Sequence, residues 1–304
     1  MRDDTLFPAG SSELDLSGPQ EKLPPEDQTA LEAAYRHLER ISYAARLTNL
    51  FGRQVELAGN LIPERARKIA NRAVDKALRA AMHVALRSLG KGGATSRVGM
   101  HRTLATASGA MGGAFGLASL PVELPLSTVI LLRAIADIAK AEGEDLTKPE
   151  TALACMQVFA LGGRTPTDDY MDGGYFAIRT LLARTVSEAT HYVAATGAAN
   201  ETAPILVRLL SQIAARFGMV VSQKIAAQAV PIFGAVGGAA VNYAFMDHFQ
   251  NLAHGHFTIR QLERTYGSER VRFAYEALHL KDVGTAPRES TGERPVASGR
   301  FLEI

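Results

Sequence analysis

The stretch TASGAMGGAFGLASLPVELP, residues 106–125, is rich in glycine and alanine and is uncharged over most of its length. Within it Gly109 and Gly113, and Gly112 and Gly116, are each four residues apart. Residues four apart lie on one face of an α-helix, so these glycines form a stripe without side chains. Glycine inside a helix costs about 1 kcal/mol relative to alanine. The pattern therefore predicts a helix whose glycine stripe is compensated by a second helix packed very close to it.

A second glycine-rich stretch is a candidate for that partner. The hexapeptide GAMGGA, residues 109–114, recurs as GAVGGA, residues 234–239, in which Gly234 and Gly238 are again four apart. Two faces of small residues allow two helix backbones to approach closely. We therefore expect two glycine-rich apolar helices packed against each other at the centre of the fold. Composition alone also explains a repeat of six small residues, and no longer period supports a duplication.

Both glycine-rich stretches belong to long uncharged runs. Residues 103–122 carry no charge over 20 positions, and residues 225–246 carry none over 22, which meets the length of a membrane-spanning helix. Small and polar residues dominate both runs, however, and Pro231 interrupts the second, whereas Leu, Ile, Phe and Val favour insertion. Buried core helices or a re-entrant hairpin are the preferred interpretation, and a true membrane span is the alternative.

The rest of the chain favours a single all-α domain with polar ends. No stretch shows the sustained alternation and β-branched enrichment of strands, and a hydrophobic fraction of 47% over 304 residues is that of a globular protein. Residues 1–26 and 281–304 are expected to be disordered tails that flank a helical domain over residues 27–280. The single Cys155 excludes an internal disulfide, and the start of the chain lacks a secretory signal, so we expect a cytoplasmic protein.

Helical periodicity places the individual helices. The expected ranges are 27–60 with a break near Gly52, 63–89, a glycine-rich helix to 119, 126–142, a helix after residue 147, 175–195, 203–217, 220–229, 232–254, 258–266 and 269–280. The start near residue 147 is the best marked. Thr147 and Glu150 have the spacing of a capping box, and Pro149 suits the first turn.

Charge is unevenly distributed along the chain. The formal net charge is only +2, yet residues 1–27 carry seven acidic against two basic side chains, and residues 36–102 carry fourteen basic against four acidic ones. An excess of this size predicts an acidic partner, either another molecule or the acidic N-terminal tail itself.

The helix expected over residues 63–89 gathers basic charge on one face. Its basic side chains recur every three or four residues, at Arg65, Lys68, Arg72, Lys76, Arg79, His83 and Arg87. Beside them the spacing predicts an apolar stripe of Ile62, Ala66, Ile69, Ala73, Ala77, Ala80 and Val84. A solvated helix face usually intersperses acids for pairing, but only Glu64 and Asp75 are available here. The six Lys and Arg side chains therefore predict binding to an anionic lipid surface.

Five polar residues in or near the apolar segments form a candidate polar site, namely Glu123, Arg133, Asn242, His254 and His256. A buried charge needs a partner, and Arg133 has Asp137 one turn on, whereas Glu123 has none nearby in the sequence. Glu123 is interpreted as a cap for the helix starting at residue 126, with a functional site as the alternative. Asn242 interrupts an apolar run and is expected to be buried and fully hydrogen-bonded.

No motif indicates a reaction, a cofactor or a metal. The Glu-x-x-His pair at Glu188 and His191 has no second copy, which a di-iron bundle requires. The histidines around residue 254 lack zinc-site spacing, and residues 168–172 depart from the calcium-loop pattern. Phosphate loops, nucleophile elbows and dinucleotide fingerprints are also missing from the sequence. We therefore predict no catalytic residue, no cofactor and no metal site.

Two segments resemble the EcsC family of bacterial proteins. They are ELPLSTVILLRAIADIAKAEGEDLTKPETALACMQVFALGG, residues 123–163, and AVPIFGAVGGAAVNYAFMDHFQNLAHGHFTIRQLERTYG, residues 229–267. The likeness extends from about residue 63 to residue 275 and includes the order of the two glycine-rich segments. The family is named for a gene found beside an ABC transporter, so the resemblance implies a transport-linked or membrane-linked role, with an ABC transporter as the implied partner. It implies no catalytic residues.

The sequence as a whole predicts a non-catalytic all-α protein that docks on the cytoplasmic face of the membrane or on a membrane complex. Two alternatives stay open. A hydrolase or peptidase requires Glu123, Arg133, His254 and His256 to converge in one buried site with a nucleophile or a metal. A nucleic-acid-binding protein would use the same basic excess, but it needs aromatic residues among the basic ones, and residues 63–102 contain none.

Overall fold

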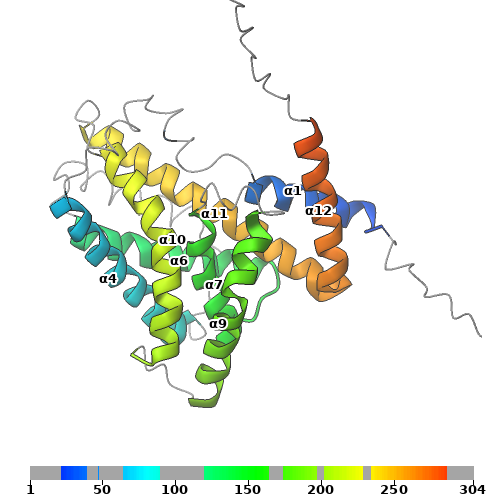
Figure 1. The fold of residues 1–304 in the computed structure, drawn as a ribbon, viewed down its shortest axis with the longest axis horizontal. Coiled ribbons are helices and arrows are strands. Elements are labelled where there is room, and N and C mark those ends of the chain that lie inside the picture. Colours follow the sequence, from blue (N-terminus) through cyan, green and yellow to red (C-terminus); the bar gives the residue numbers. More distant parts are fainter. Residues whose placement is uncertain are drawn as a thin grey trace, which may run out of the picture.

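The computed structural model describes residues 22–39, 47, 64–89, 120–163, 174–196, 202–228 and 234–285, and helices are the regular secondary structure within them. The helices are α1 (Pro25–Glu39), α4 (Glu64–Ser88), α6 (Leu120–Ala141), α7 (Pro149–Leu161), α9 (Gly174–Thr196), α10 (Pro204–Gln228), α11 (Gly234–Tyr266) and α12 (Ser268–Thr285) (Figure 1). The predicted all-α class is confirmed for this part of the chain.

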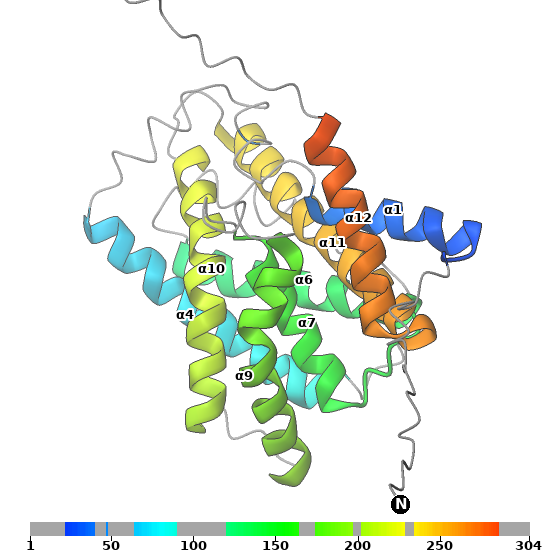
Figure 2. The same cartoon turned by 45° about the vertical axis from the view of Figure 1, so that its right-hand side comes forward.

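Helix α7 lies at the centre of the described fold. Its residues from Thr151 to Leu161 are all buried, and it packs against α4, α6, α9, α10 and α11. Figures 1 and 2 show these helices arranged around α7, with α1 and α12 to one side. A helix covered on every side is apolar around its whole circumference, which explains the sequence ALACMQVFAL of residues 152–161.

Four phenylalanines join α7 to its neighbours α10 and α11. They are Phe159, Phe217, Phe245 and Phe249, and their contacting ring centroids lie 5.1 to 6.0 Å apart in tilted or edge-to-face arrangements. Such pairs contribute about 0.5–1.5 kcal/mol each beyond the area that they bury. The aromatic cluster therefore holds the central layer of the fold together.

Helix α1 packs against α11 at an unusually short distance. A Cβ atom built on Gly255 of α11 would lie 2.6 Å from Leu38 Cγ and 3.0 Å from the backbone oxygen of Ala34. Tyr275 of α12 closes this corner, with its ring centroid 5.1 Å from that of Tyr35. Close approach of two helices at a glycine thus occurs here, at a position that the glycine-stripe pattern did not indicate.

The predicted pair of glycine stripes lies largely outside the described residues, which do not include Gly109, Gly112, Gly113 and Gly116. Gly234 and Gly238 lie in the first turns of α11, and Gly238 is buried. Packing of one stripe against the other therefore stays a prediction.

Two helix breaks predicted from the sequence are wrong. Residues 203–217 and 220–229 belong mainly to one helix, α10, and residues 232–254 and 258–266 belong mainly to α11. Gly218 continues α10 because the buried face is in register on both sides of it, at Phe217 before it and Val220 and Val221 after it. The break expected near Pro231 lies outside the described residues, since α10 is described to Gln228 and α11 from Gly234.

The starts of α6 and α7 also differ from expectation. Helix α6 begins at Leu120, six residues early, and Pro125 removes a single backbone donor near its start. The N-cap of α7 is Lys148 and not the predicted Thr147. Asp145 accepts hydrogen bonds from the backbone N–H and the hydroxyl of Thr147, at 3.0 and 2.6 Å. The Thr147 hydroxyl is therefore already engaged in the turn before the helix.

The ends of the described fold extend slightly past the predicted domain. Helix α1 begins at Pro25, and α12 continues to Thr285, into the segment expected as a tail from residue 281. Lys22, the first described residue, is held against α12, because Arg270 Nη2 donates to its backbone oxygen at 2.9 Å.

Among the described helices, α10 alone is long and apolar enough to cross a membrane by length and composition. One face of α10 is buried, and its exposed positions are Pro204, Arg208, Ser211, Ala215 and Ser222. The described residues of the uncharged run over 225–246 belong to α10, up to Gln228, and to α11, from Gly234.

Candidate functional site

A glutamate, a lysine and an asparagine from three helices meet inside the fold. Lys224 Nζ lies 2.9 Å from Glu123 Oε1, and Asn242 Nδ2 donates to the same oxygen at 3.2 Å. All three side chains are buried, and Lys224 has no exposed surface. We refer to Glu123, Lys224 and Asn242 as the buried polar cluster.

The helices place each member of the cluster on a buried face. Glu123 lies in the first turn of α6, where the helix dipole favours negative charge. Lys224 lies near the end of α10 and continues the buried series of Phe217 and Val221 at helical spacing. Asn242 lies in the first half of α11. The cluster therefore connects the N-terminal end of α6, the C-terminal end of α10 and the first half of α11.

Charge pairing explains how the cluster tolerates burial. Removing an ion from water costs several kcal/mol, and this cost is offset only when the opposite charge is close and further polar groups complete its shell. Glu123 supplies that charge to Lys224, and the Phe245 ring centroid lies 4.9 Å from Lys224 Nζ, within cation–π distance. The Lys224–Glu123 pair is a direct link between α6 and α10.

Two of the five residues of the predicted polar site belong to this cluster. Asn242 is buried and its Nδ2 is hydrogen-bonded, but its buried Oδ1 accepts no hydrogen bond from the described residues, so the expected full hydrogen bonding is met only in part. Glu123 lies in the first turn of α6, but its carboxylate binds Lys224 and Asn242, and the helix that it was expected to cap starts earlier. Arg133 is exposed, and its Nη2 donates to Ser88 Oγ of α4 at 3.3 Å. The structure thus separates Arg133 from the cluster.

His256 lies in a second buried network. Tyr175 Oη lies 2.9 Å from His256 Nδ1, and Arg179 Nη1 donates to Tyr175 Oη at 3.3 Å. Arg179 also donates to both carboxylate oxygens of Glu263, at 2.8 and 2.9 Å. Burial, reinforced by the charges of Arg179 and Arg260, holds the pKa of His256 well below its ordinary value. His256 is therefore a neutral, structural imidazole.

His254 and Cys155 lie in surroundings that differ from those of His256. His254 is half-exposed, and its Nδ1 lies 3.9 Å from Glu142 Oε1. Burial raises the pKa of the Cys155 thiol, so Cys155 stays protonated and is a poor nucleophile. Within the described residues no three His, Cys, Asp or Glu side chains are grouped to hold a metal.

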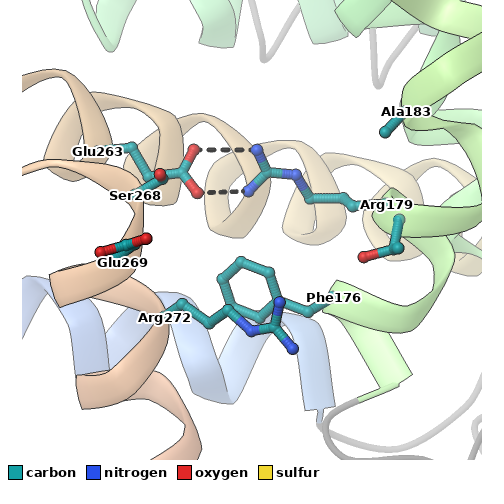
Figure 3. A pocket seen from close by; sticks show the side chains of 8 residues that line it. Phe176, Arg179, Ala183, Glu263, Ser268, Glu269 and Arg272 are labelled. Carbon is teal, nitrogen blue, oxygen red and sulfur yellow. Dashed lines mark hydrogen bonds and ion pairs between the residues drawn. The ribbon is translucent and has the colours of Figure 1, made fainter.

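A surface pocket of about 390 Å³ lies beside the His256 network (Figure 3). Its lining residues are Phe176, Arg179, Thr180, Ala183, Glu263, Ser268, Glu269 and Arg272. Figure 3 shows the two parallel bonds between Arg179 and Glu263 on one wall. Arg272 Nε lies 2.7 Å from Glu276 Oε1. Both arginines of the pocket are therefore paired with carboxylates, which leaves little net positive charge to attract an anion.

The low pKa of His256 predicts a pH-dependent stability. Below about pH 6.5 the unfolded chain binds a proton at this residue and the folded protein does not, so the free energy of unfolding falls as pH is lowered. The slope of the free energy of unfolding against pH approaches about 1.4 kcal/mol per pH unit. In His256→Gln this contribution disappears. Denaturant titrations between pH 7 and pH 5 should show a weaker pH dependence for the variant, and equal slopes would contradict the assignment.

The predicted basic side chains of α4 all point to solvent. Arg65, Lys68, Arg72, Lys76, Arg79 and Arg87 are exposed, and we call these six residues the basic stripe. Among the described residues the stripe makes a single ion pair, between Lys68 and Glu64 at 2.8 Å, and both side chains are largely exposed. Such a pair contributes little to stability. The stripe is therefore a nearly uncompensated positive surface.

The apolar face of α4 is rotated from the predicted stripe. Its buried residues are Ala70, Ala73, Val74, Ala77, Leu78, Ala81, Met82 and Ala85. Ile69 is 42% exposed, and Ala80 and Val84 are half-buried. The rotation follows from the packing partners, since α4 is held by α6, α7 and α10 together. It leaves a border of partly exposed apolar side chains beside the basic stripe.

Lys224 was not among the residues predicted from the sequence. Lys224 directly precedes the uncharged run that begins at residue 225, so in the sequence it resembles a solvent-exposed residue at the edge of that run. The usable signal is its spacing, because Lys224 lies three and seven residues after the apolar Val221 and Phe217. A lysine at that spacing lies on the apolar face of its helix, where a charged side chain needs a buried partner.

The fold and the site together define an all-helical protein with a buried ion pair between its helices and a basic helix on its surface. Residues 26–262 match the EcsC protein family, and the chain belongs to that family. The matched residues include α1 from Glu26 onward, whereas the resemblance in the sequence begins at about residue 63. No curated protein and no solved structure matches the chain.

Proposed function

We propose that this protein is a non-catalytic, membrane-associated protein that docks reversibly on the cytoplasmic face of the membrane through the basic stripe of α4. The supporting observation is that all six Lys and Arg side chains of the stripe are exposed on one helix. The exposed residues of α4 include only two acids, Glu64 and Asp75. Positive surfaces of this kind are attracted to anionic lipid headgroups.

The expected strength of the interaction suits reversible docking. Each Lys or Arg near an anionic leaflet contributes about 1 kcal/mol, so six side chains supply about 6 kcal/mol, the equivalent of four orders of magnitude in affinity. Exposed charges are screened at high ionic strength. Salt is therefore expected to release the protein from the membrane.

Family membership and helix composition favour this function over its rivals. The EcsC resemblance implies a transport-linked role, so a membrane complex such as an ABC transporter is the alternative docking partner. A hydrolase or peptidase is less well supported, because the residues expected to form its site are separated in the structure. A nucleic-acid-binding protein is disfavoured, because α4 contains no aromatic residue for base stacking.

Vesicle sedimentation tests the proposal. The protein should sediment with phosphatidylcholine vesicles that contain phosphatidylglycerol and stay in solution with phosphatidylcholine alone. The triple variant Arg72→Glu, Lys76→Glu, Arg79→Glu should bind about 100-fold more weakly or worse, because three favourable contributions of about 1 kcal/mol are lost and repulsion is added. Its denaturant midpoint should match that of the unmodified protein, because these side chains are solvated.

A matched control separates the stripe from net charge. The variant Arg36→Glu, Arg184→Glu, Arg272→Glu changes the net charge equally, at exposed positions of α1, α9 and α12. It should retain most of the binding. Equal loss in both variants, or equal sedimentation with neutral vesicles, would reject the basic stripe as the docking surface. Binding to membranes that requires an added membrane protein would favour the complex instead.

A further inference from the structure

The outward face of α6 carries apolar side chains where solvent-facing positions are usually polar. Val122 is 72% exposed and Leu126 is 52% exposed, and Val129 is half-buried on the same face. These residues are spaced by four and three positions and so form a single line. We call Val122, Leu126 and Val129 the α6 apolar stripe. Isolated apolar side chains on a surface need no explanation, but a line of them on one helix does.

This stripe adjoins the basic helix. Arg133, four residues after Val129, continues the same line on α6 and donates to Ser88 Oγ at the last residue of α4. Helices α4 and α6 pack against each other more extensively than any other described pair. Ile69 of α4 adds a further exposed apolar side chain beside the basic stripe. The outward faces of α4 and α6 therefore combine apolar and cationic groups on neighbouring helices.

The buried polar cluster determines which way the start of α6 faces. Glu123 points inward to Lys224 and Asn242, and Val122 is its direct neighbour in the sequence. Tyr243 of α11, the neighbour of Asn242, is also substantially exposed. Tyrosine is enriched where protein meets the membrane–water interface. The ion pair thus fixes the start of α6 so that Glu123 faces inward and Val122 faces outward.

We infer that the α6 apolar stripe inserts into the interfacial region of an anionic bilayer when the basic stripe docks on its headgroups. The inference rests on the proposed function and extends it from electrostatic contact to partial insertion. Charge complementarity selects the occupant. Apolar side chains next to several unpaired Lys and Arg residues match a surface with acyl chains below anionic headgroups, as in interfacial helices. A neutral protein partner would leave the basic stripe without a counter-charge.

Single-tryptophan fluorescence tests the insertion, because the chain contains no tryptophan. Leu126→Trp places the probe on the α6 apolar stripe, and Leu181→Trp, at a position of α9 that is 61% exposed, is the matched control. With vesicles containing phosphatidylglycerol, emission of the first variant should move to shorter wavelength and be quenched by brominated acyl chains. Emission of the control should not change. Val122→Ser with Leu126→Ser should weaken vesicle binding about tenfold or more.

The outcomes separate the two proposals, because sedimentation is measured on the same samples. Sedimentation without quenching at position 126 would overturn insertion and leave electrostatic docking in place. Failure of the unmodified protein to sediment with anionic vesicles would overturn both. Quenching at both probe positions would indicate a rearranged chain on the membrane and reject the assigned face. A spectral shift at position 126 that grows with protein concentration in the absence of vesicles would identify a second copy of the chain as the occupant.

Discussion

Lys224→Met is expected to lower the free energy of unfolding by about 3–5 kcal/mol, which is the usual cost of removing one partner of a buried ion pair. The variant retains the length and apolar stem of the side chain, so the cavity is small. It leaves the Glu123 carboxylate buried with Asn242 as its remaining donor in the cluster. Denaturant unfolding followed by circular dichroism measures the change. Lys76→Met, an equivalent change at an exposed position, should alter stability by less than about 0.5 kcal/mol.

A double variant distinguishes loss of the ion pair from loss of packing. Glu123→Gln combined with Lys224→Met removes both charges and keeps an amide oxygen that Asn242 can bond. Replacing a whole buried pair by neutral groups is often neutral for stability, so the double variant should be more stable than Lys224→Met alone. If its destabilisation equals the sum of the two single changes, the pair contributes no coupling and the electrostatic explanation is wrong.

Gly163→Ala is expected to destabilise the protein by about 3 kcal/mol, near the upper end of the usual range for overpacking. A Cβ atom at this buried position would lie 2.2 Å from the backbone oxygen of Arg216 and 2.7 Å from its carbonyl carbon. The obstacle is the backbone of α10, which cannot rotate away as a side chain can. The end of α7 and the middle of α10 must therefore move apart, and denaturant unfolding measures the loss.

Gly218→Ala is the matched control, two residues after Arg216 in the same helix. A Cβ atom there meets no atom within 4 Å, and alanine is a better helix former than glycine by about 1 kcal/mol. This change should stabilise the protein. Opposite signs for the two substitutions would establish the close approach at Gly163, and equal effects would exclude it.

Local features of the fold were predictable because helix periodicity depends on neighbours three and four residues away. The basic side chains of α4 recur at that spacing, and all six are exposed as the pattern predicts. The helical class follows from the same local rules. Two predictions made by these local rules are wrong. The Thr147 hydroxyl bonds to Asp145 instead of capping α7. The break expected near Gly218 does not occur, because the buried face of α10 is continuous there.

The site depended on contacts that no local rule contains. Glu123 and Lys224 are 101 positions apart in the sequence and meet only because α4, α7 and α11, each of which packs against both α6 and α10, set one particular register between them. The same register separates Arg133, His254 and His256, which the sequence places in comparable apolar surroundings. The sequence by itself determined which residues lie on a common helix face. Only the tertiary structure decided which faces are buried together, because a charge or a glycine acquires its role from the atoms that another helix brings to it.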